Sequence, residues 1–222
     1  MSAPASPRDA AVDARDAAVD TVALQPDEVA PAAGSPYAVL RWLVVAAFVV
    51  ILNETVMVNA IPRLMVQFDV TESAAQWLST AFMLTMAVVI PATGWFLQRF
   101  TTRQAFAAAM GTFIAGTVLA AAAPTFGVLI AARVVQASGT AVMIPLLMTT
   151  LMTIVPEHDR GRVMGNVTLA ISVAPALGPT VAGVVLQVAS WRWLFLVMLP
   201  LAALILAAAM RRLTDVGEPK PG

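Results

Sequence analysis

The sequence predicts an all-α integral membrane protein whose six transmembrane helices form two three-helix inverted repeats. Three observations predict this fold class. Hydrophobic residues make up 59% of the 222 residues and charged residues only 12%, whereas soluble domains are about 45–50% apolar. The apolar residues gather into six blocks, each close to the roughly 20 residues that a helix needs to cross a bilayer. The residue types that distinguish the first three blocks from one another recur, in the same order, in the last three blocks.

The six blocks cover residues 40–62, 75–97, 105–123, 126–154, 163–189 and 192–210. Polar connectors at 63–72, 98–104, 156–162 and 190–193 separate them, and a Pro124-Thr125 break divides the third block from the fourth. The fourth and fifth blocks exceed the usual span, so we expect them to be tilted or to extend beyond the lipid. All five tryptophans lie close to block ends, as is typical of indoles at a membrane interface.

The repeat lies in the kind of residues that each block contains, and the sequence shows no fixed short period. Blocks one and four each hold a polar cluster, blocks two and five each hold internal prolines or glycines, and blocks three and six are plain. This correspondence indicates two inverted three-helix repeats.

The ends of the chain are polar. Residues 1–36 carry six acids against Arg8 and Arg15 and no aromatic residue, which predicts a disordered acidic tail. The basic start and apolar run of a signal peptide are missing, so we expect the tail to stay in the cytosol. Residues 37–212 are then the transmembrane domain, and residues 213–222 are a second cytosolic tail or the start of a truncated central linker.

Composition excludes several classes of site. Thirteen Lys and Arg balance thirteen Asp and Glu, which speaks against nucleic acid as a partner. The chain has no cysteine and one histidine, so thiol chemistry, iron–sulfur clusters and multi-histidine metal sites lack their ligands. We expect neither a metal nor an organic cofactor.

The arginines predict the orientation. With the amino-terminal tail inside, the outer side receives only Arg63 and Arg192. The inner side receives Arg41, Arg99, Arg103, Arg160, Arg162, Arg211 and Arg212. Because positive residues are retained in the cytoplasm, this predicts a multi-pass protein of the plasma (inner) membrane with both termini cytoplasmic.

Glu54 stands inside the first block, flanked by Asn53 and Thr55. A carboxylate at that depth costs at least about 2.5 kcal/mol, so its side chain should face protein or water. Such an environment makes reversible protonation near neutral pH feasible. Proton or cation handling is one interpretation, and a structural carboxyl group bonded to a neighbouring helix is the other.

Arg133 stands inside the fourth block, with Gln136 and Thr140 on the same helical stripe and Gly139 allowing close backbone approach. The arginine could bind the anionic form of an acid or organise water beside it. Alternatively, it lies only about 10 Å of helical rise inside its block and could extend its side chain to the outer interface.

Two further segments stand out. Gly178, Pro179 and Gly183 in the fifth block suit a bent helix that packs closely on a neighbour. Gly94 precedes Arg99 and Arg103, which lie one helical turn apart at the inner face, where ordinary topology charge is the alternative interpretation.

In this order, the segments resemble the amino-terminal half of a major facilitator superfamily transporter, most closely the multidrug:proton antiporters of the EmrB/QacA type. The resemblance covers about residues 40 to 215. The residues that carry it are Leu52, Thr55, Pro62, Gly94, Arg99, Arg103, Arg133, Gln136, Gly139, Ala141, Gly178, Pro179, Gly183, the segment 191–195 and Pro200. Asn53 stands where the family has aspartate, with Glu54 beside it. Gln98 and Thr101 replace an aspartate and a glycine of the loop pattern.

The resemblance implies export of hydrophobic or cationic compounds by alternating access, driven by a proton gradient without a cofactor. Glu54 would carry the proton, Arg133 with Gln136 would set its affinity, and the Gly178-Pro179 helix would form a moving seam. The implied partners are the lipid bilayer, a small hydrophobic substrate, protons, and a carboxy-terminal half or a second copy. The alternative is a truncated, non-transporting membrane module or scaffold that needs a partner half. An enzyme is not expected, since no base lies near an intramembrane serine such as Ser138.

Overall fold

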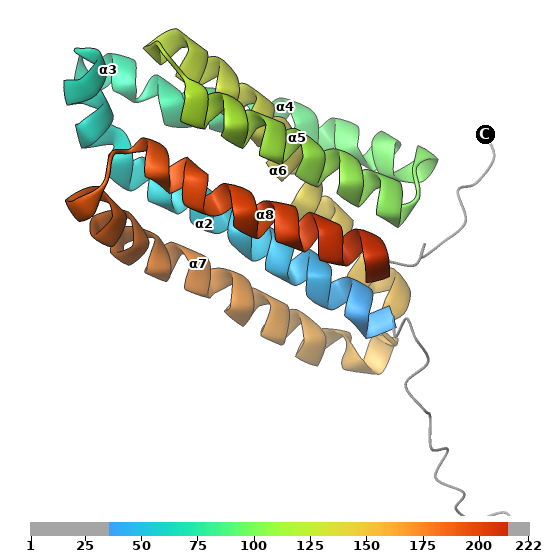
Figure 1. Ribbon diagram of the computed structural model, residues 1–222. Helices are drawn as coiled ribbons and strands as arrows, with labels where there is room; N and C mark the ends of the chain where they lie inside the picture. Colours follow the sequence, from blue (N-terminus) through green and yellow to red (C-terminus); the bar gives the residue numbers. More distant parts are fainter. Residues whose placement is uncertain (1–35, 213–222) are drawn as a thin grey trace, which may run out of the picture. The chain divides into compact units, whose positions relative to one another are not determined.

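The computed structural model describes residues 36–212, and this part of the chain contains helices and no strand (Figure 1). The elements in order are α2 (Pro36–Phe68), α3 (Glu72–Ala75), α4 (Trp77–Arg99), α5 (Thr102–Ala122), α6 (Phe126–Ile154), the 3-10 helix η1 (Glu157–Asp159), α7 (Arg160–Val188) and α8 (Arg192–Arg212). Within residues 36–212, six spans are long and apolar enough to cross a membrane, with α3 and α4 together forming one. The predicted all-α fold with six transmembrane helices is therefore confirmed. Residues 1–35 and 213–222, which hold nearly all of the two predicted tails, lie outside the described residues.

Helix α2 is longer than the sequence predicted. It continues six residues beyond Pro62 to Phe68, and at 33 residues it is longer than α6 and α7, which have 29 residues each. Proline removes one hydrogen bond from a helix, but apolar contacts hold the extension: Leu64 is fully buried, and Phe68 packs on the rings of Phe126 and Trp191. The predicted end at Pro62 was wrong because burial outweighs this loss.

Threonines in the polar connectors fix three helix starts. Thr71, Thr101 and Thr125 each accept a hydrogen bond from a backbone amide in the first turn of the helix that follows. Gln104 completes a capping box by accepting from the Thr101 amide at 3.2 Å. Such caps satisfy amides that the helix leaves free, so the connectors can be as short as two residues.

The packing of the helices follows an inverted repeat. Helix α2 lies between α7 and α8, α6 lies between α4 and α5, and further contacts join α2 to α6 and α5 to α8 (Figure 1). Exchanging α2 with α6, α4 with α7 and α5 with α8 converts the α2–α7 and α2–α8 pairings into the α4–α6 and α5–α6 pairings and leaves the α2–α6 and α5–α8 pairings unchanged. The first helix of each repeat therefore packs among helices of the other repeat, and α2 and α6 form the centre.

The two ends of the bundle differ. Helix α2 begins and α8 ends at one end, which we call the terminal end, and the α2–α3, α5–α6 and α7–α8 connections lie at the other, the far end (Figure 1). Over their most apolar stretches, α2 and α6 are 50% and 56% buried, whereas α4 and α7 are only 17% buried. Helices α4 and α7 therefore present most of their apolar surface to lipid or to another protein.

Candidate functional site

An ion pair joins the two central helices inside the bundle. The Nη2 atom of Arg133 on α6 donates to the Oε2 atom of Glu54 on α2. The Arg133 side chain is 0% exposed and that of Glu54 is 21% exposed. The arginine therefore does not extend to the membrane interface, and that alternative is wrong. Because two desolvated charges are stable only when they are closely paired, the two helices are tied together at this point.

A chain of hydrogen bonds continues from the ion pair into α5. Arg133 Nη1 donates to Gln136 Oε1 at 2.6 Å, and Gln136 Nε2 donates to Thr117 Oγ1 at 2.8 Å. The Thr117 hydroxyl in turn donates to the backbone oxygen of Phe113 at 2.7 Å. All of these side chains are buried, so this chain of hydrogen bonds fixes the orientation of the guanidinium group.

An aromatic ring from a fourth helix completes the surroundings of Arg133. The guanidinium carbon lies 4.2 Å from the ring centroid of Phe82 on α4, which is itself buried. A cation over an aromatic face is attracted by the ring's negative face, and more strongly so away from water. The arginine is thus held by a carboxylate, an amide and a ring from three helices. The sequence singled out neither Phe82 nor Thr117, because threonine and phenylalanine are ordinary residues in apolar helices.

The cluster retains unused hydrogen-bonding capacity. Glu54 Oε1, Arg133 Nε and Asn53 Nδ2 are buried atoms without a hydrogen-bond partner among the described residues. Asn53 is 2% exposed, so its amide is held inside the bundle next to Glu54. One oxygen of Glu54 is therefore bound to arginine, and the other can accept a proton or a hydrogen bond from another donor.

Thr55 links this cluster to α7. Its hydroxyl donates to the backbone oxygen of Ile51 at 3.0 Å, and its methyl group lies against Gly178. A Cβ atom added at Gly178 would lie 2.6 Å from the Cβ of Thr55, which is too close for two carbon atoms. Gly183, in contrast, faces open space, and Pro179 is exposed. Of the three motif residues on α7, only Gly178 is at a close helix contact.

We expect Gly178→Ala to destabilise the protein by about 1–3 kcal/mol, because the new methyl group must push α2 and α7 apart. Gly183→Ala on the same helix should change the stability by no more than about 1 kcal/mol, and towards greater stability, because alanine favours helix. Thermal unfolding of the two purified variants in the same detergent compares them. Equal melting temperatures would show that the α2–α7 contact at Gly178 is not tight.

The residues of the predicted cytoplasmic loop motif lie away from the ion pair of Glu54 and Arg133. Gly94 and Arg99 belong to the last turns of α4 and Arg103 to the first turn of α5, at the terminal end. The guanidinium carbon of Arg99 lies 4.8 Å from the ring centroid of Trp95. A Cβ at Gly94 would meet no atom within 4 Å. None of the contacts that hold Arg133 comes from this loop.

Comparisons with known proteins give a consistent family. The sequence profile of the Major Facilitator Superfamily matches residues 43–222. The chain is 46% identical over 172 residues to an uncharacterised MFS-type transporter, YcnB, of Bacillus subtilis, covering 77% of this chain and 36% of that protein. It is 40% identical over 181 residues to the lincomycin resistance protein LmrB of Listeria monocytogenes, covering 82% of this chain and 38% of that protein.

The fold agrees with solved transporters. A bacterial homologue of the human lysosomal transporter Spinster superposes with a TM-score of 0.68 at 18% identity, covering 85% of this chain and 45% of that one. The chain thus spans a little over a third of the length of the two curated relatives.

Proposed function

Because this chain belongs to the Major Facilitator Superfamily, a family of multi-pass membrane transporters and not of enzymes, we propose that it forms all or part of a proton-coupled exporter. In this proposal it moves hydrophobic or cationic compounds across the plasma membrane by alternating access. The proton gradient supplies the energy, and no cofactor takes part.

The observation that carries the proposal is the state of Glu54. Its Oε2 atom is paired with Arg133, while its Oε1 atom has no partner among the described residues. A carboxyl group inside a membrane protein is expensive to keep there, and intramembrane acids commonly take part in proton relays. A carboxylate with one uncommitted oxygen can accept a proton without first losing its place in the structure.

Arg133 would couple the proton to the helices. When Glu54 is charged, the ion pair draws α2 and α6 together. When Glu54 is protonated, the attraction between the charges is lost, and Gln136 and the Phe82 ring still hold the guanidinium group. Protonation therefore weakens one contact between the two central helices and leaves α6 intact, which is what a switch between two packings of a bundle requires.

The substrate class follows from the relatives and the composition. The relative from Listeria monocytogenes is named for resistance to lincomycin, and we extend only the general class, a drug-like compound, to this protein. Twelve methionines supply flexible apolar side chains of the kind that adapt to substrates of different shape.

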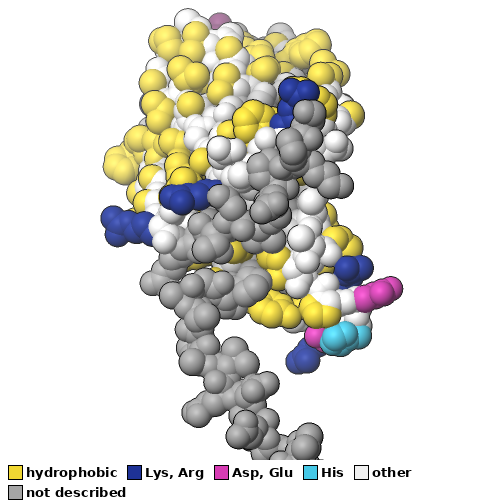
Figure 2. Space-filling model, turned by 90° about the vertical axis from the view of Figure 1, so that its right-hand side faces the viewer, with side chains coloured by type: hydrophobic (Ala, Val, Ile, Leu, Met, Phe, Trp, Pro, Cys, Tyr) yellow, Lys and Arg dark blue, Asp and Glu magenta, His cyan; other side chains and the backbone are white. Residues whose placement is uncertain are grey.

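We place the terminal end in the cytoplasm. Six arginines with described side chains lie at this end, and two lie at the far end. The six are Arg41, Arg99, Arg103, Arg160, Arg162 and Arg211, and the two are Arg63 and Arg192. Figure 2, which views the terminal end, shows several basic groups on this face. This bias is the one that retention of positive charge in the cytoplasm produces.

Transport between alternating faces would need a second set of helices. The apolar surfaces of α4 and α7 are the least covered of the six spans, so a carboxy-terminal half or a second copy would pack there. The same exposure supports the alternative function, a membrane module that does not transport until a partner half covers it. Reconstitution of the chain alone, tested for proton-linked movement of ethidium, separates the two.

Glu54→Gln tests the proton role. The amide keeps the shape of the side chain but cannot carry a proton as a carboxyl group does, so we expect pH-driven ethidium uptake into everted vesicles to fall at least about tenfold, in line with general acid–base residues. The vesicles come from cells that express the chain alone or with a candidate carboxy-terminal half.

The matched control is Glu157→Gln, which changes an exposed carboxylate in η1 and should leave uptake unchanged. Both variants must be present in the membrane at wild-type levels. Undiminished uptake by Glu54→Gln would remove the proton role from this residue.

A further inference from the structure

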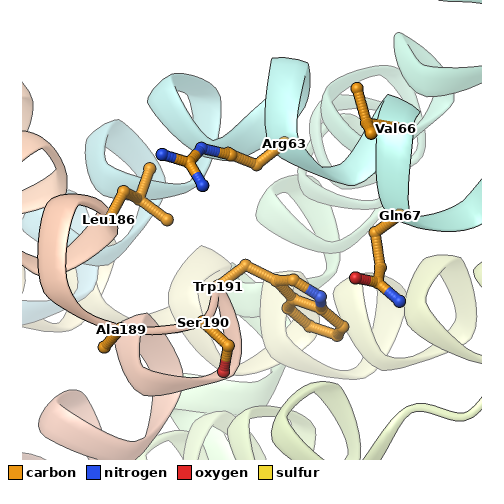
Figure 3. A pocket seen from close by; sticks show the side chains of 7 residues that line it. All are labelled: Arg63, Val66, Gln67, Leu186, Ala189, Ser190 and Trp191. Carbon is orange, nitrogen blue, oxygen red and sulfur yellow. The ribbon is translucent and has the colours of Figure 1, made fainter.

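A cavity of about 330 Å³ opens at the far end of the bundle, away from the Glu54 cluster (Figure 3). It lies between the last turns of α2, the end of α7 and the connection to α8. Its lining consists of Arg63, Val66, Gln67, Leu186, Ala189, Ser190 and Trp191. The polar members of this set all carry hydrogen-bond donors, and none is acidic.

The donors at the rim are uncommitted. The side chains of Arg63, Gln67 and Ser190 are exposed and make no hydrogen bond or ion pair with any residue that the structure describes. Arg63 and Gln67 lie one turn apart on α2, and Ser190 lines the cavity from the α7–α8 connection (Figure 3). A positive charge, an amide and a hydroxyl group therefore belong to the lining of one cavity.

The floor of the cavity contains a buried donor without an acceptor. Trp191 is 4% exposed, and its Nε1 atom has no partner among the described residues. Figure 3 shows the indole across the cavity with its nitrogen toward Gln67. Packing against Phe68 and Phe195 fixes the ring, with centroids 5.6 and 6.1 Å away. An indole nitrogen can only donate, so an acceptor that enters the cavity would give this group a partner.

A second arginine adds positive charge below the ring. The guanidinium carbon of Arg192 lies 4.5 Å from the ring centroid of Trp191, and its Nη2 atom donates to the backbone oxygen of Ala123 at 3.0 Å. This arginine is held in place by the α5 terminus and does not line the cavity. It makes the surroundings of the indole N–H still more favourable for an anion.

We propose that this cavity binds the phosphate of an anionic ester, with the headgroup of an anionic phospholipid as its source. Phosphate oxygens accept hydrogen bonds and pair with arginine, which matches a lining of donors and one cation. The position favours a lipid: Trp77 and Trp193 begin helices at the same end, where indoles mark the interface. Val66 and Leu186, which line the cavity, offer apolar surface to acyl chains.

Native mass spectrometry of the purified full chain, titrated with phosphatidylglycerol or phosphatidylcholine, tests the proposal. We expect phosphatidylglycerol to bind more tightly, and Arg63→Gln to weaken it about fivefold, the equivalent of about 1 kcal/mol for one arginine near a headgroup. Trp191→Phe removes the N–H donor together with the fused five-membered ring, so it should weaken the same lipid severalfold and, because the buried side chain becomes smaller, lower the melting temperature modestly.

Arg41→Gln is the matched control, because Arg41 is an exposed arginine on the same helix at the opposite end, and it should leave binding unchanged. Titration with inorganic phosphate distinguishes the sources. In one outcome, phosphate raises the melting temperature as much as phosphatidylglycerol does, and Arg63→Gln abolishes the effect. That result would support an anion site in this cavity and would replace the lipid headgroup with a soluble phosphate as its ligand. If Arg63→Gln and Trp191→Phe both bind phosphatidylglycerol as the wild type does, the proposal is overturned.

Discussion

Replacing Arg133 with alanine is expected to lower the free energy of unfolding by about 3–5 kcal/mol, the range measured when one partner of a buried ion pair is removed. The change leaves the Glu54 carboxylate inside the bundle without its counter-charge, and it leaves Gln136 Oε1 without its donor. It also removes a side chain that is fully buried, so a cavity adds to the loss. Unfolding of the purified protein by titration with sodium dodecyl sulfate in mixed micelles measures this difference.

Two comparisons separate the charge effect from the loss of volume. Arg41→Ala removes an exposed arginine on α2 and should change the stability by no more than about 0.5 kcal/mol. In a Glu54→Gln background, Arg133→Ala should be at least about 1 kcal/mol less damaging, because no unpaired charge remains. An identical loss in the two backgrounds would mean that the pair does not contribute beyond packing.

The two charged members of this cluster could be predicted from the sequence because lipid excludes charge. Glu54 and Arg133 are conspicuous in apolar blocks, and each had to find a partner inside the protein. The three-plus-three pattern also indicated that the first and fourth spans occupy equivalent places in two repeats. What the pattern could not give is the direction in which each side chain points, and so it left open whether Arg133 turns inward or toward the interface.

Phe82 and Thr117 could not be predicted, for a physical reason. A threonine in a helix can bond its hydroxyl to its own backbone, as Thr117 does, and a phenylalanine is at home in lipid or in a core. Neither residue is out of place in an apolar block. Only the crossing of α4 and α5 over α6 turns them into the ring and the hydroxyl that hold Arg133 and Gln136.

The contacts of the glycines could not be predicted from the sequence either. Gly178 and Gly183 belong to one motif, yet only Gly178 lies at a helix crossing. Gly116 on α5 drew no attention in the sequence, but a Cβ there would lie 2.7 Å from the Cα of Gln136. Close approach depends on both helices. The sequence therefore shows where a glycine would allow a neighbouring helix to come close, but it does not show at which glycines a helix does so.

Gly139→Ala is expected to be more damaging than Gly178→Ala, at about 3 kcal/mol or more. A Cβ at this position would overlap the backbone oxygen of Ala109 and would lie 2.7 Å from the backbone nitrogen of Phe113. Backbone atoms inside a helix cannot move aside as a side chain can, so α5 and α6 must separate along their length. That separation pulls Thr117 away from Gln136, and the effect therefore reaches the residues that orient Arg133.

The same helix offers the control for Gly139→Ala. Gly127 also lies on α6, and a Cβ there would meet no atom within 4 Å, so Gly127→Ala should leave the free energy of unfolding within about 1 kcal/mol of the wild type. The difference between the two variants, measured by the same detergent titration, isolates the helix crossing from the general effect of alanine in a helix. If Gly139→Ala unfolds at the same detergent fraction as Gly127→Ala, then α5 and α6 do not pack as closely as the Thr117–Gln136 hydrogen bond requires. The fixed orientation of Arg133 would then have to come from Glu54 and Phe82 alone.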